Sequence, residues 1–480
     1  MLTRDESENL QRTLPLWKNV IDYWVIGVDV LNTDNSEEII YNELGHLPGK
    51  IVVVNFTGMG PTWTILVEEG IKSFPEATHG IIADADFSPL NNHFDRSQLD
   101  PMSSKHLFEM YSDERRNIRT LDWVYRNIPG VKIERRVHQI IKVPKIPGQE
   151  QYATWIDLPV EDREGGYMDR TGEKQLRYIY YLELDLQDFP NDTRTLYYLG
   201  YAHYEFFFKN QDNPQPEHWE HLAKGVEILE QRSKIPKGNY EERWFSILLR
   251  AEIYERFYRN WEEAEKLYKQ CHEIDPERAD PYFYIGQNYR MAKDYEKAFF
   301  YFNKVITLPF PSRNLFNWRR MYDCLRYIEM ARVIYHIDVP RRHLTFILER
   351  LKEAQNNQIC AEDRPGLKEM YGKLKVRTKF MMKLSKVKNS INHFWKKKKK
   401  IILPIIGEEI GDKLERRTKR ILKVSTCYTF KRERKKYLSL FDNTNADILQ
   451  DLDETHEDIV DKWEDVLDSL KKVKCKINNK

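Results

Sequence analysis

An internal repeat in the middle of the chain limits most strongly what this sequence can fold into. The tetrapeptide at residues 261–264 (Trp-Glu-Glu-Ala) recurs at 295–298 (Tyr-Glu-Lys-Ala), an offset of 34 residues. A period of this length fits one helix–turn–helix unit, which cannot bury its apolar face alone and must stack on its neighbours. The repeat therefore predicts an array of packed helix pairs.

The residue types at these positions resemble the tetratricopeptide repeat (TPR). Tyr268 and Phe302 keep the same offset, and residues 198–200 (Tyr-Leu-Gly) match residues 284–286 (Tyr-Ile-Gly) as first-helix positions. Small residues allow packed helices to approach closely, and aromatic residues fill the space between them. We expect an all-α, TPR-like helical-repeat domain over residues 172–340.

The region before the repeats alternates short apolar runs with helical patterns. This order predicts an α/β domain over residues 1–165, with a mostly parallel sheet and helices on both faces. Ligands of such sheets bind at the carboxyl ends of the strands. The expected strands are residues 23–28, 50–56 and 80–83, and the expected helices are 36–47, capped by Ser36, and 62–74.

Two acidic residues follow the third expected strand, as Asp84-Ala85-Asp86. On extended backbone, residues two apart point to the same side, so both carboxylates can hold a hard divalent cation. Such a cation neutralises the charge that builds on a nucleoside diphosphate leaving group. An isolated Asp-x-Asp is more often a solvated turn, so the weight of this motif depends on its neighbours in the chain.

The ordered set of motifs resembles the family-2 glycosyltransferases, in the branch that is fused to TPR repeats. The resemblance covers residues 1–340. Its motifs are residues 4–6 (Arg-Asp-Glu), 28–36, 84–86, 123–127, 136–139, 162–166 with Lys174, and 189–194.

This resemblance implies a GT-A-like fold and a hexosyltransferase-like activity. The donor would be a UDP- or GDP-sugar, the transfer would invert the sugar's configuration, and the cofactor would be Mn²⁺ or Mg²⁺. Glu6, Asp29 and Asp84 would bind the donor, and Asp86 would bind the metal together with Asp84. The acceptor would be a protein or glycan presented by the repeats.

An inverting transfer needs a base to deprotonate the acceptor hydroxyl. Asp162 is the catalytic candidate, with Glu161 beside it, and both can equally be solvated loop carboxylates. His138 is a second candidate, as a residue at or behind the metal site. A histidine on an apolar strand can also be a core residue whose hydrogen bonds are satisfied.

Three departures from the family's pattern favour a second function class. The usual first strand is nearly absent, Trp63 stands where many relatives place an arginine, and Gln139 stands where many have a glutamate. The alternative is a TPR interaction or scaffold protein with a degenerate, inactive transferase domain. The intact pair Asp84 and Asp86, together with Asp29, favours the enzyme.

Cysteine usage and hydropathy give an expected compartment. The five cysteines are scattered and form no CxxC pair, which predicts a reduced compartment without a disulfide framework or structural zinc site. No apolar run reaches the length that a membrane span needs. We expect a cytoplasmic protein. The cysteines are Cys271, Cys324, Cys360, Cys427 and Cys475.

The last third of the chain, residues 341–480, reads as a charged tail that is helical or partly disordered. Residues 371–440 carry a net charge of +18, and residues 441–470 carry −10. The basic part can bind an anionic membrane surface, contact nucleic acid through phosphates without sequence specificity, or pair with the acidic part. We expect no specific nucleic-acid partner, and peripheral membrane contact stays open.

Overall fold

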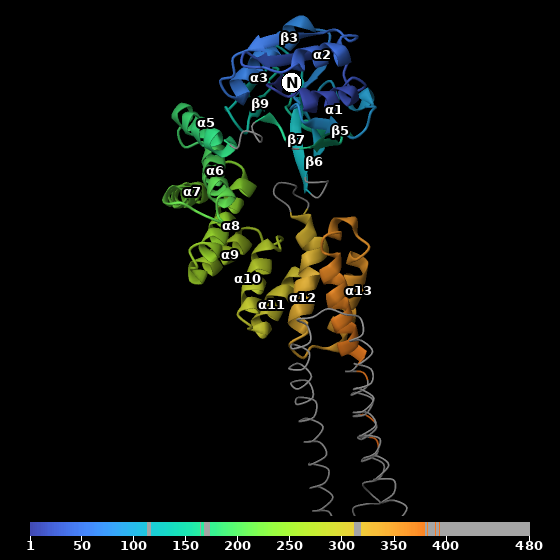
Figure 1. Ribbon diagram of the computed structural model, residues 1–480, viewed down its shortest axis with the longest axis vertical. Helices are drawn as coiled ribbons and strands as arrows, with labels where there is room; N and C mark the ends of the chain where they lie inside the picture. The colour runs from blue at the N-terminus through green and yellow to red at the C-terminus, as the bar shows by residue number, and fades with distance from the viewer. Residues whose placement is uncertain are drawn as a thin grey trace, which may run out of the picture. The chain divides into compact units, whose positions relative to one another are not determined.

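The computed structural model describes residues 1–112, 117–163, 165–167, 173–311 and 318–379, together with the single positions 382, 389 and 393. Within the compact unit Met1–Lys375, a mixed α/β region is followed by an all-α, TPR-like helical region (Figure 1). The predicted basic and acidic segments of the tail fall almost wholly outside the described residues.

A small parallel sheet forms the first layer of the α/β region. Its order is β1-β2-β3, with Leu2 paired to Gly27 and Trp24 paired to Gly49. Side chains alternate along β2, so Ile26 packs with α1 and α2 while Val25 packs with α3 on the other face. The predicted helices on both faces are thereby confirmed for this sheet. The elements are β1 (Leu2–Thr3), α1 (Ser7–Trp17), β2 (Trp24–Asp29), α2 (Ser36–Leu44), β3 (Gly49–Val54) and α3 (Met59–Ser73).

The strand before the acidic motif belongs to a second, mixed sheet, so the prediction of one mostly parallel sheet is wrong. This sheet has the order β4-β7-β6-β11-β5, with β10 paired to β6, and β4 runs antiparallel to β7. An apolar run predicts a strand but does not predict which strand pairs with it. Here the partner of β4 is β7, which lies later in the chain and forms a hairpin with β6. The elements are β4 (His79–Ile81), β5 (Phe87–Pro89), β6 (Lys105–Ser112), β7 (Asn117–Arg126), β10 (Ala153–Trp155) and β11 (Val160–Asp162), besides the separate hairpin β8 (Lys132–Glu134) and β9 (Ile140–Lys142).

The start of α2 differs from the expectation that Ser36 caps it. Asn35 occupies the N-cap, and Ser36 is the first helical residue and fully buried. The side chain that accepts the Ser36 backbone N–H, at 3.0 Å, is Asp34. An Asx turn therefore takes the place of the serine hydroxyl at the start of this helix.

Paired helices build the all-α region, as the repeat predicts. Ala264 on α9 and Ala298 on α11 are fully buried, and the ring of Phe302 lies 3.0 Å from where a Cβ on Gly286 would stand. A larger residue at position 286 would push α10 away from α11. The helices are α5 (Lys174–Asp188), α6 (Thr193–Lys209), α7 (Pro216–Lys234), α8 (Tyr240–Arg256), α9 (Trp261–Ile274), α10 (Asp280–Met291), α11 (Tyr295–Val305), α12 (Arg326–Ile334) and α13 (Arg341–Ala354).

The cysteines also depart from the prediction that none is paired. Cys324 and Cys360 form a disulfide with Cα atoms 5.7 Å apart, while Cys271 is unpaired and buried. A separation of 36 residues has no sequence signature, because folding alone brings the two segments together. Scattered spacing therefore gives no argument for a reduced compartment. Among the described helices, none is both long and apolar enough to cross a bilayer.

Candidate functional site

The acidic pair after β4 lies in a turn and not on extended backbone. The strand ends at Ile81, and the N–H of Phe87 donates to the carbonyl of Asp84 at 3.2 Å. Asp84 and Asp86 are both partly exposed, whereas Ala85 between them is buried. Both side chains are therefore partly exposed, as the motif predicts, although the prediction of extended backbone is wrong.

A third carboxylate, that of Asp162, stands close to this pair. Asp162 ends β11 and is in register with Phe87 of β5, next to Asp86. Burial, together with the charges of Asp86 and Asp162, raises the pKa of Asp84 to about 7, while the N-terminal amine and Lys174 act against this rise. Acids that shift one another in this way form one electrostatic cluster. Asp84, Asp86 and Asp162 are called the acidic cluster below.

Glu6 lies near the same cluster, and the backbone of Gly166 passes between Glu6 and Asp86. Glu6 is buried, and its carboxylate accepts the side-chain N–H of Asn9 at 2.7 Å and the backbone N–H of Tyr167 at 2.5 Å. A Cβ on Gly166 would lie 3.1 Å from Asp86 Oδ2 and 3.5 Å from Glu6 Oε1. Glycine at 166 therefore lets the chain pass between two carboxylates that the sequence assigned to one site.

Asp29 is held at the carboxyl end of β2 by backbone groups. Its Oδ1 accepts the N–H of Leu31 at 2.9 Å, and its Oδ2 accepts the N–H of Phe56 at 3.1 Å. The carboxylate is buried, and each oxygen keeps a lone pair for another donor. Asp29 therefore joins the loop after β2 to the loop after β3.

The loop after β2 is fastened to the segment that carries Glu6. Asp5 accepts the backbone N–H of Thr33 at 2.7 Å, and Asp34 accepts the N–H of Ser7 at 2.8 Å. Asp5 has a positive φ of 52°, which an aspartate tolerates better than most residues. The two segments that the family resemblance assigned to the nucleoside are thus tied together before any ligand arrives.

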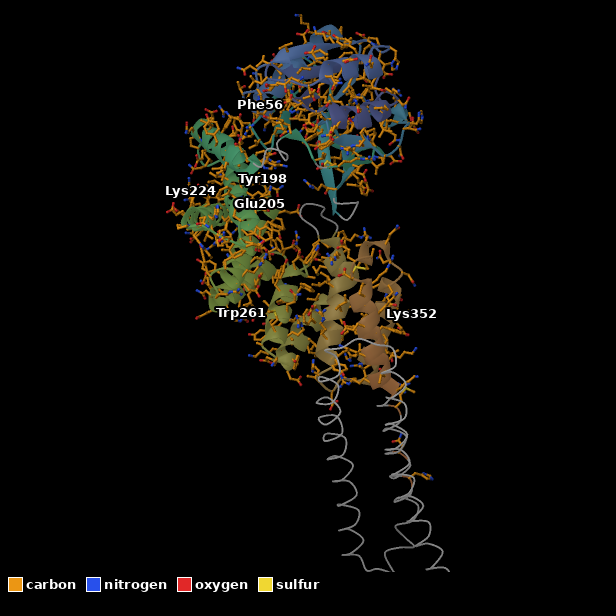
Figure 2. All side chains as sticks on the ribbon, in the orientation of Figure 1. Phe56, Tyr198, Glu205, Lys224, Trp261 and Lys352 are labelled. Atoms are coloured by element: carbon orange, nitrogen blue, oxygen red, sulfur yellow. A yellow bond between two sulfur atoms is a disulfide. The ribbon has the colours of Figure 1, made fainter. Side chains whose placement is uncertain are left out.

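His138 lies against the helical region. Its ring stacks on Tyr198 of α6 with centroids 3.5 Å apart and meets Tyr178 of α5 edge-on (Tyr198 is labelled in Figure 2). Burial, together with the charges of Arg194, Lys174 and Arg119, lowers the pKa of His138 to about 3. A neutral, stacked imidazole suits packing between the two regions better than general-base chemistry at neutral pH.

Trp63 belongs to the core. It is 2% exposed and packs with Val54, Leu66 and Tyr125. A side chain in this position cannot face a diphosphate, so α3 supplies no cation at the site through residue 63. Gln139 is partly exposed and follows His138.

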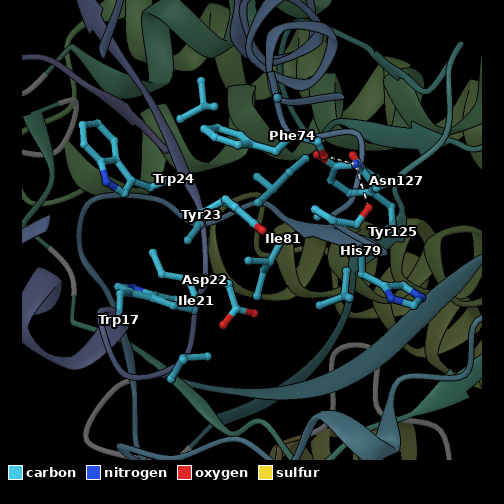
Figure 3. Close-up of a pocket in the computed structure, with 18 of the residues that line it drawn as sticks. Trp17, Ile21, Asp22, Tyr23, Trp24, Phe74, His79, Ile81, Tyr125 and Asn127 are labelled. Carbon is cyan, nitrogen blue, oxygen red and sulfur yellow. Dashed lines mark hydrogen bonds between the residues drawn. The ribbon is translucent and has the colours of Figure 1, made fainter. Parts of the chain in front are cut away.

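A large cavity of the α/β region is lined by none of these carboxylates. It has a volume of about 800 Å³ and lies at the amino-terminal ends of β2 and β4. Its walls are mostly apolar and include Trp17, Tyr23, Phe74, His79 and Tyr125 (Figure 3). Ligands of α/β sheets bind at the opposite ends of the strands, so this cavity does not mark the donor site.

The acidic cluster suits a hard divalent cation by its chemistry. Carboxylate oxygens are the ligands that Mg²⁺ and Mn²⁺ prefer, and mutual repulsion already raises the pKa of Asp84. Among the described residues, however, no group of three or more His, Cys, Asp or Glu side chains is arranged so that it could hold a metal ion by itself. Mg²⁺ at nucleotide sites is commonly held by one or two carboxylates with substrate phosphates, and Asp84 and Asp86 fit that arrangement.

Sequence reasoning missed several residues at this site. Lys174 appeared only in a junction motif, yet its charge acts on Asp84 and on His138. Tyr167 and Tyr181 carry no motif, because their place depends on how α5 docks on the α/β region. Aromatic richness in the helical region was the available signal, and it does not separate core rings from site rings.

Comparison with known proteins gives a likeness in the helical region. No protein-family model and no curated protein matches the chain. The MamA protein has 14% identity and a TM-score of 0.27, covering 41% of this chain and 88% of its own. A thermophilic TPR protein of Thermus thermophilus has 18% identity and a TM-score of 0.23, covering 43% of this chain and 96% of its own. TM-scores this low carry no argument about the fold. The description of the helical region as TPR-like therefore rests on its own paired helices.

Proposed function

We propose that the chain is a glycosyltransferase that moves a sugar from a UDP- or GDP-sugar to an acceptor hydroxyl. The observation that carries the proposal is the acidic cluster, which lies next to Glu6, while the loop after Asp29 is tied to the segment that carries Glu6. Burial and the neighbouring carboxylates raise the pKa of Asp84 to about 7, and carboxylates with strongly shifted pKa values are common at functional sites.

The roles of the residues follow from their chemistry and position. Asp29 and Glu6 accept hydrogen bonds from the nucleoside of the donor, and both are buried and oriented by backbone N–H groups or Asn9. Asp84 and Asp86 would hold Mn²⁺ or Mg²⁺. When bound, the ion offsets the negative charge of the diphosphate leaving group.

Asp162 is the proposed base for the acceptor hydroxyl. It lies close enough to Asp84 to raise the pKa of that carboxylate. Glu161, its neighbour on the strand, is paired with Arg163 at 2.8 Å. An inverting transfer with Asp162 as the base needs no covalent sugar–enzyme intermediate. The helical region would present the protein or glycan acceptor.

The proposal is tested by donor hydrolysis. Purified protein is incubated with Mn²⁺ and a panel of UDP- and GDP-sugars, and release of the nucleoside diphosphate is measured. We expect turnover of at least one donor, loss of turnover in Asp86→Ala, and unchanged turnover in Asp157→Ala, whose side chain is exposed. Absence of both binding and turnover for every donor would reject the enzyme.

A specific observation favours a second candidate, an interaction protein that works through its helices. Large apolar side chains are exposed on the helical region, among them Met291 at 70% and Phe300 at 55%. Exposed apolar surface of this kind commonly marks protein contacts. Under this alternative, Asp86→Ala changes nothing measurable, whereas Met291→Asp and Phe300→Asp abolish binding of a purified partner.

A further inference from the structure

Helix α5 of the helical region faces the loops that the proposed function assigns to the donor. A hollow of about 330 Å³ lies along this helix. Positions three and four apart share one face of a helix, so Arg177, Tyr180 and Tyr181 can line it together. The lining residues are Glu173, Leu176, Arg177, Tyr180 and Tyr181.

An aromatic pair joins α5 to Asp29. The ring of Tyr181 meets the ring of Phe56 edge-on, with centroids 5.9 Å apart (Phe56 is labelled in Figure 2). The backbone N–H of the same Phe56 donates to Asp29 Oδ2 at 3.1 Å. Burial raises the pKa of Tyr181, and the charge of Asp29 contributes to that rise, so the phenol and the carboxylate are neighbours.

Two guanidinium groups lie around Tyr167, and the charge of one of them, Arg177, also acts on Tyr181. The Arg4 guanidinium stands 4.6 Å from the centre of the Tyr167 ring, and that of Arg177 stands 5.9 Å from it. The backbone N–H of Tyr167 donates to Glu6, which connects these cations to the buried carboxylates. Glu173 orients Arg177 through a contact of 2.9 Å.

We infer that α5 forms one wall of the donor's nucleotide site. Tyr181 and Phe56 offer aromatic surface to the base, Asp29 accepts a ring N–H, and Arg177 with Arg4 faces the diphosphate. Stacking on an aromatic ring and pairing of guanidinium with phosphate are the common means of holding a nucleotide. The inference rests on the proposed function, and it assigns part of the donor site to the helical region.

The test measures nucleotide binding and not turnover. UDP, GDP and uridine are titrated in the presence of Mn²⁺ into the full chain by calorimetry. We expect Tyr181→Leu, which keeps apolar bulk without a π face, to weaken binding of both UDP and uridine about tenfold. Tyr181→Phe keeps the ring and should bind as the unaltered chain does. Tyr258→Leu, which changes an exposed tyrosine of the helical region outside this hollow, is the matched control.

Arg177→Met separates the two halves of the inference. We expect it to weaken UDP about tenfold and to leave uridine unchanged, because only the diphosphate needs the cation. Thermal melting of each variant shows whether it still folds. Comparing Tyr181→Leu with Tyr181→Phe shows whether the loss of binding follows from loss of the aromatic ring.

The outcomes distinguish this inference from the proposed function. If the unaltered chain binds UDP or GDP and Tyr181→Leu binds equally well, α5 is no part of the site and the transferase proposal stands. If Tyr181→Leu and Tyr258→Leu weaken binding alike, the effect is one of general packing and the inference fails. If the unaltered chain binds no nucleotide, both are overturned.

Discussion

At the scale of single residues, Asp84 lies in surroundings that penalise its charge. Burial and the two neighbouring carboxylates raise its folded-state pKa to about 7 from an ordinary 3.8. Between these values the unfolded chain has released the proton while the folded chain holds it, so the free energy of unfolding falls as pH rises from about 4 to 7. Above about pH 7, Asp84 is ionised in the folded chain as well, and the full destabilisation from its charge is present.

Asp84→Asn should therefore stabilise the protein at pH 8 and not at pH 4. We expect a gain of about 1–3 kcal/mol at pH 8 without divalent ions, less than the full shift implies because the carboxylate is partly exposed. Urea unfolding with a chelator at both pH values measures it, and exposed Asp157→Asn is the control. An equal effect at both pH values would contradict the assigned cause.

Gly166 allows a second prediction at this scale. The added methyl of Gly166→Ala would stand 3.1 Å from Asp86 Oδ2, closer than most Cβ contacts, so Asp86 or the loop must move. We expect binding of UDP with Mn²⁺ to weaken about tenfold, as for other changes behind a metal ligand. Calorimetry measures the affinity. The control is Gly70→Ala on α3, where the nearest atom is 3.8 Å away, and equal losses in both variants would refute the prediction.

At the scale of elements, the sequence predicts what depends on local pattern. The strands near 23–28 and 50–56, the helices on both faces of the first sheet, and the 34-residue repeat follow from periodicity and small buried residues such as Ala264 and Ala298. The partner of β4 does not, since its pairing with β7 is set by tertiary packing. The Cys324–Cys360 bridge and the position of Tyr181 could not be predicted for the same reason, because both depend on tertiary packing.

Besides its aromatic contacts, α5 is joined to the α/β region by the ion pairs of Arg136, which can be tested. Arg136 Nη1 lies 2.8 Å from Asp185 and 2.6 Å from Asp188, and its backbone N–H donates to Asp185 at 2.8 Å. The Asp185 side chain is 1% exposed, and burial raises its pKa while Arg136 opposes that rise. Removing the cation leaves a buried carboxylate without its main partner.

Arg136→Met should therefore lower the free energy of unfolding by about 3 kcal/mol. The matched control is Lys224→Met, which removes a partly exposed pair with Glu183 and should cost less than about 0.5 kcal/mol. Urea unfolding at pH 7 compares the two. Similar small losses would show that Arg136 does not hold α5 in place.

At the scale of the whole unit Met1–Lys375, polar ties run from the α/β region into the first helices. Arg135 binds Asp192 at the start of α6 at 3.0 Å. Arg194 donates to the carbonyl of His138 at 3.0 Å and pairs with Glu242 of α8 at 2.7 Å. Phe56, whose N–H donates to Asp29, contacts Tyr181 of α5, so a ligand that orders the loop of Asp29 would also stabilise α5 and, next to it, α6. No such tie reaches the described residues of α13.

Hydrogen exchange can reveal this coupling. With UDP and Mn²⁺ at about 100 times the dissociation constant, openings that abolish binding cost about 2.7 kcal/mol more and become about a hundredfold rarer. We expect slower exchange in residues 29–36, in α5 and in the first turn of α6, and unchanged exchange in α13. In Tyr181→Leu, at matched saturation, residues 29–36 should keep their protection while α5 loses it. Unchanged exchange in α5 of the unaltered chain would disprove the coupling. Slowing of α5 and α13 to the same degree would also disprove it, because the contacts described between the α/β region and the helices reach α5 and not α13.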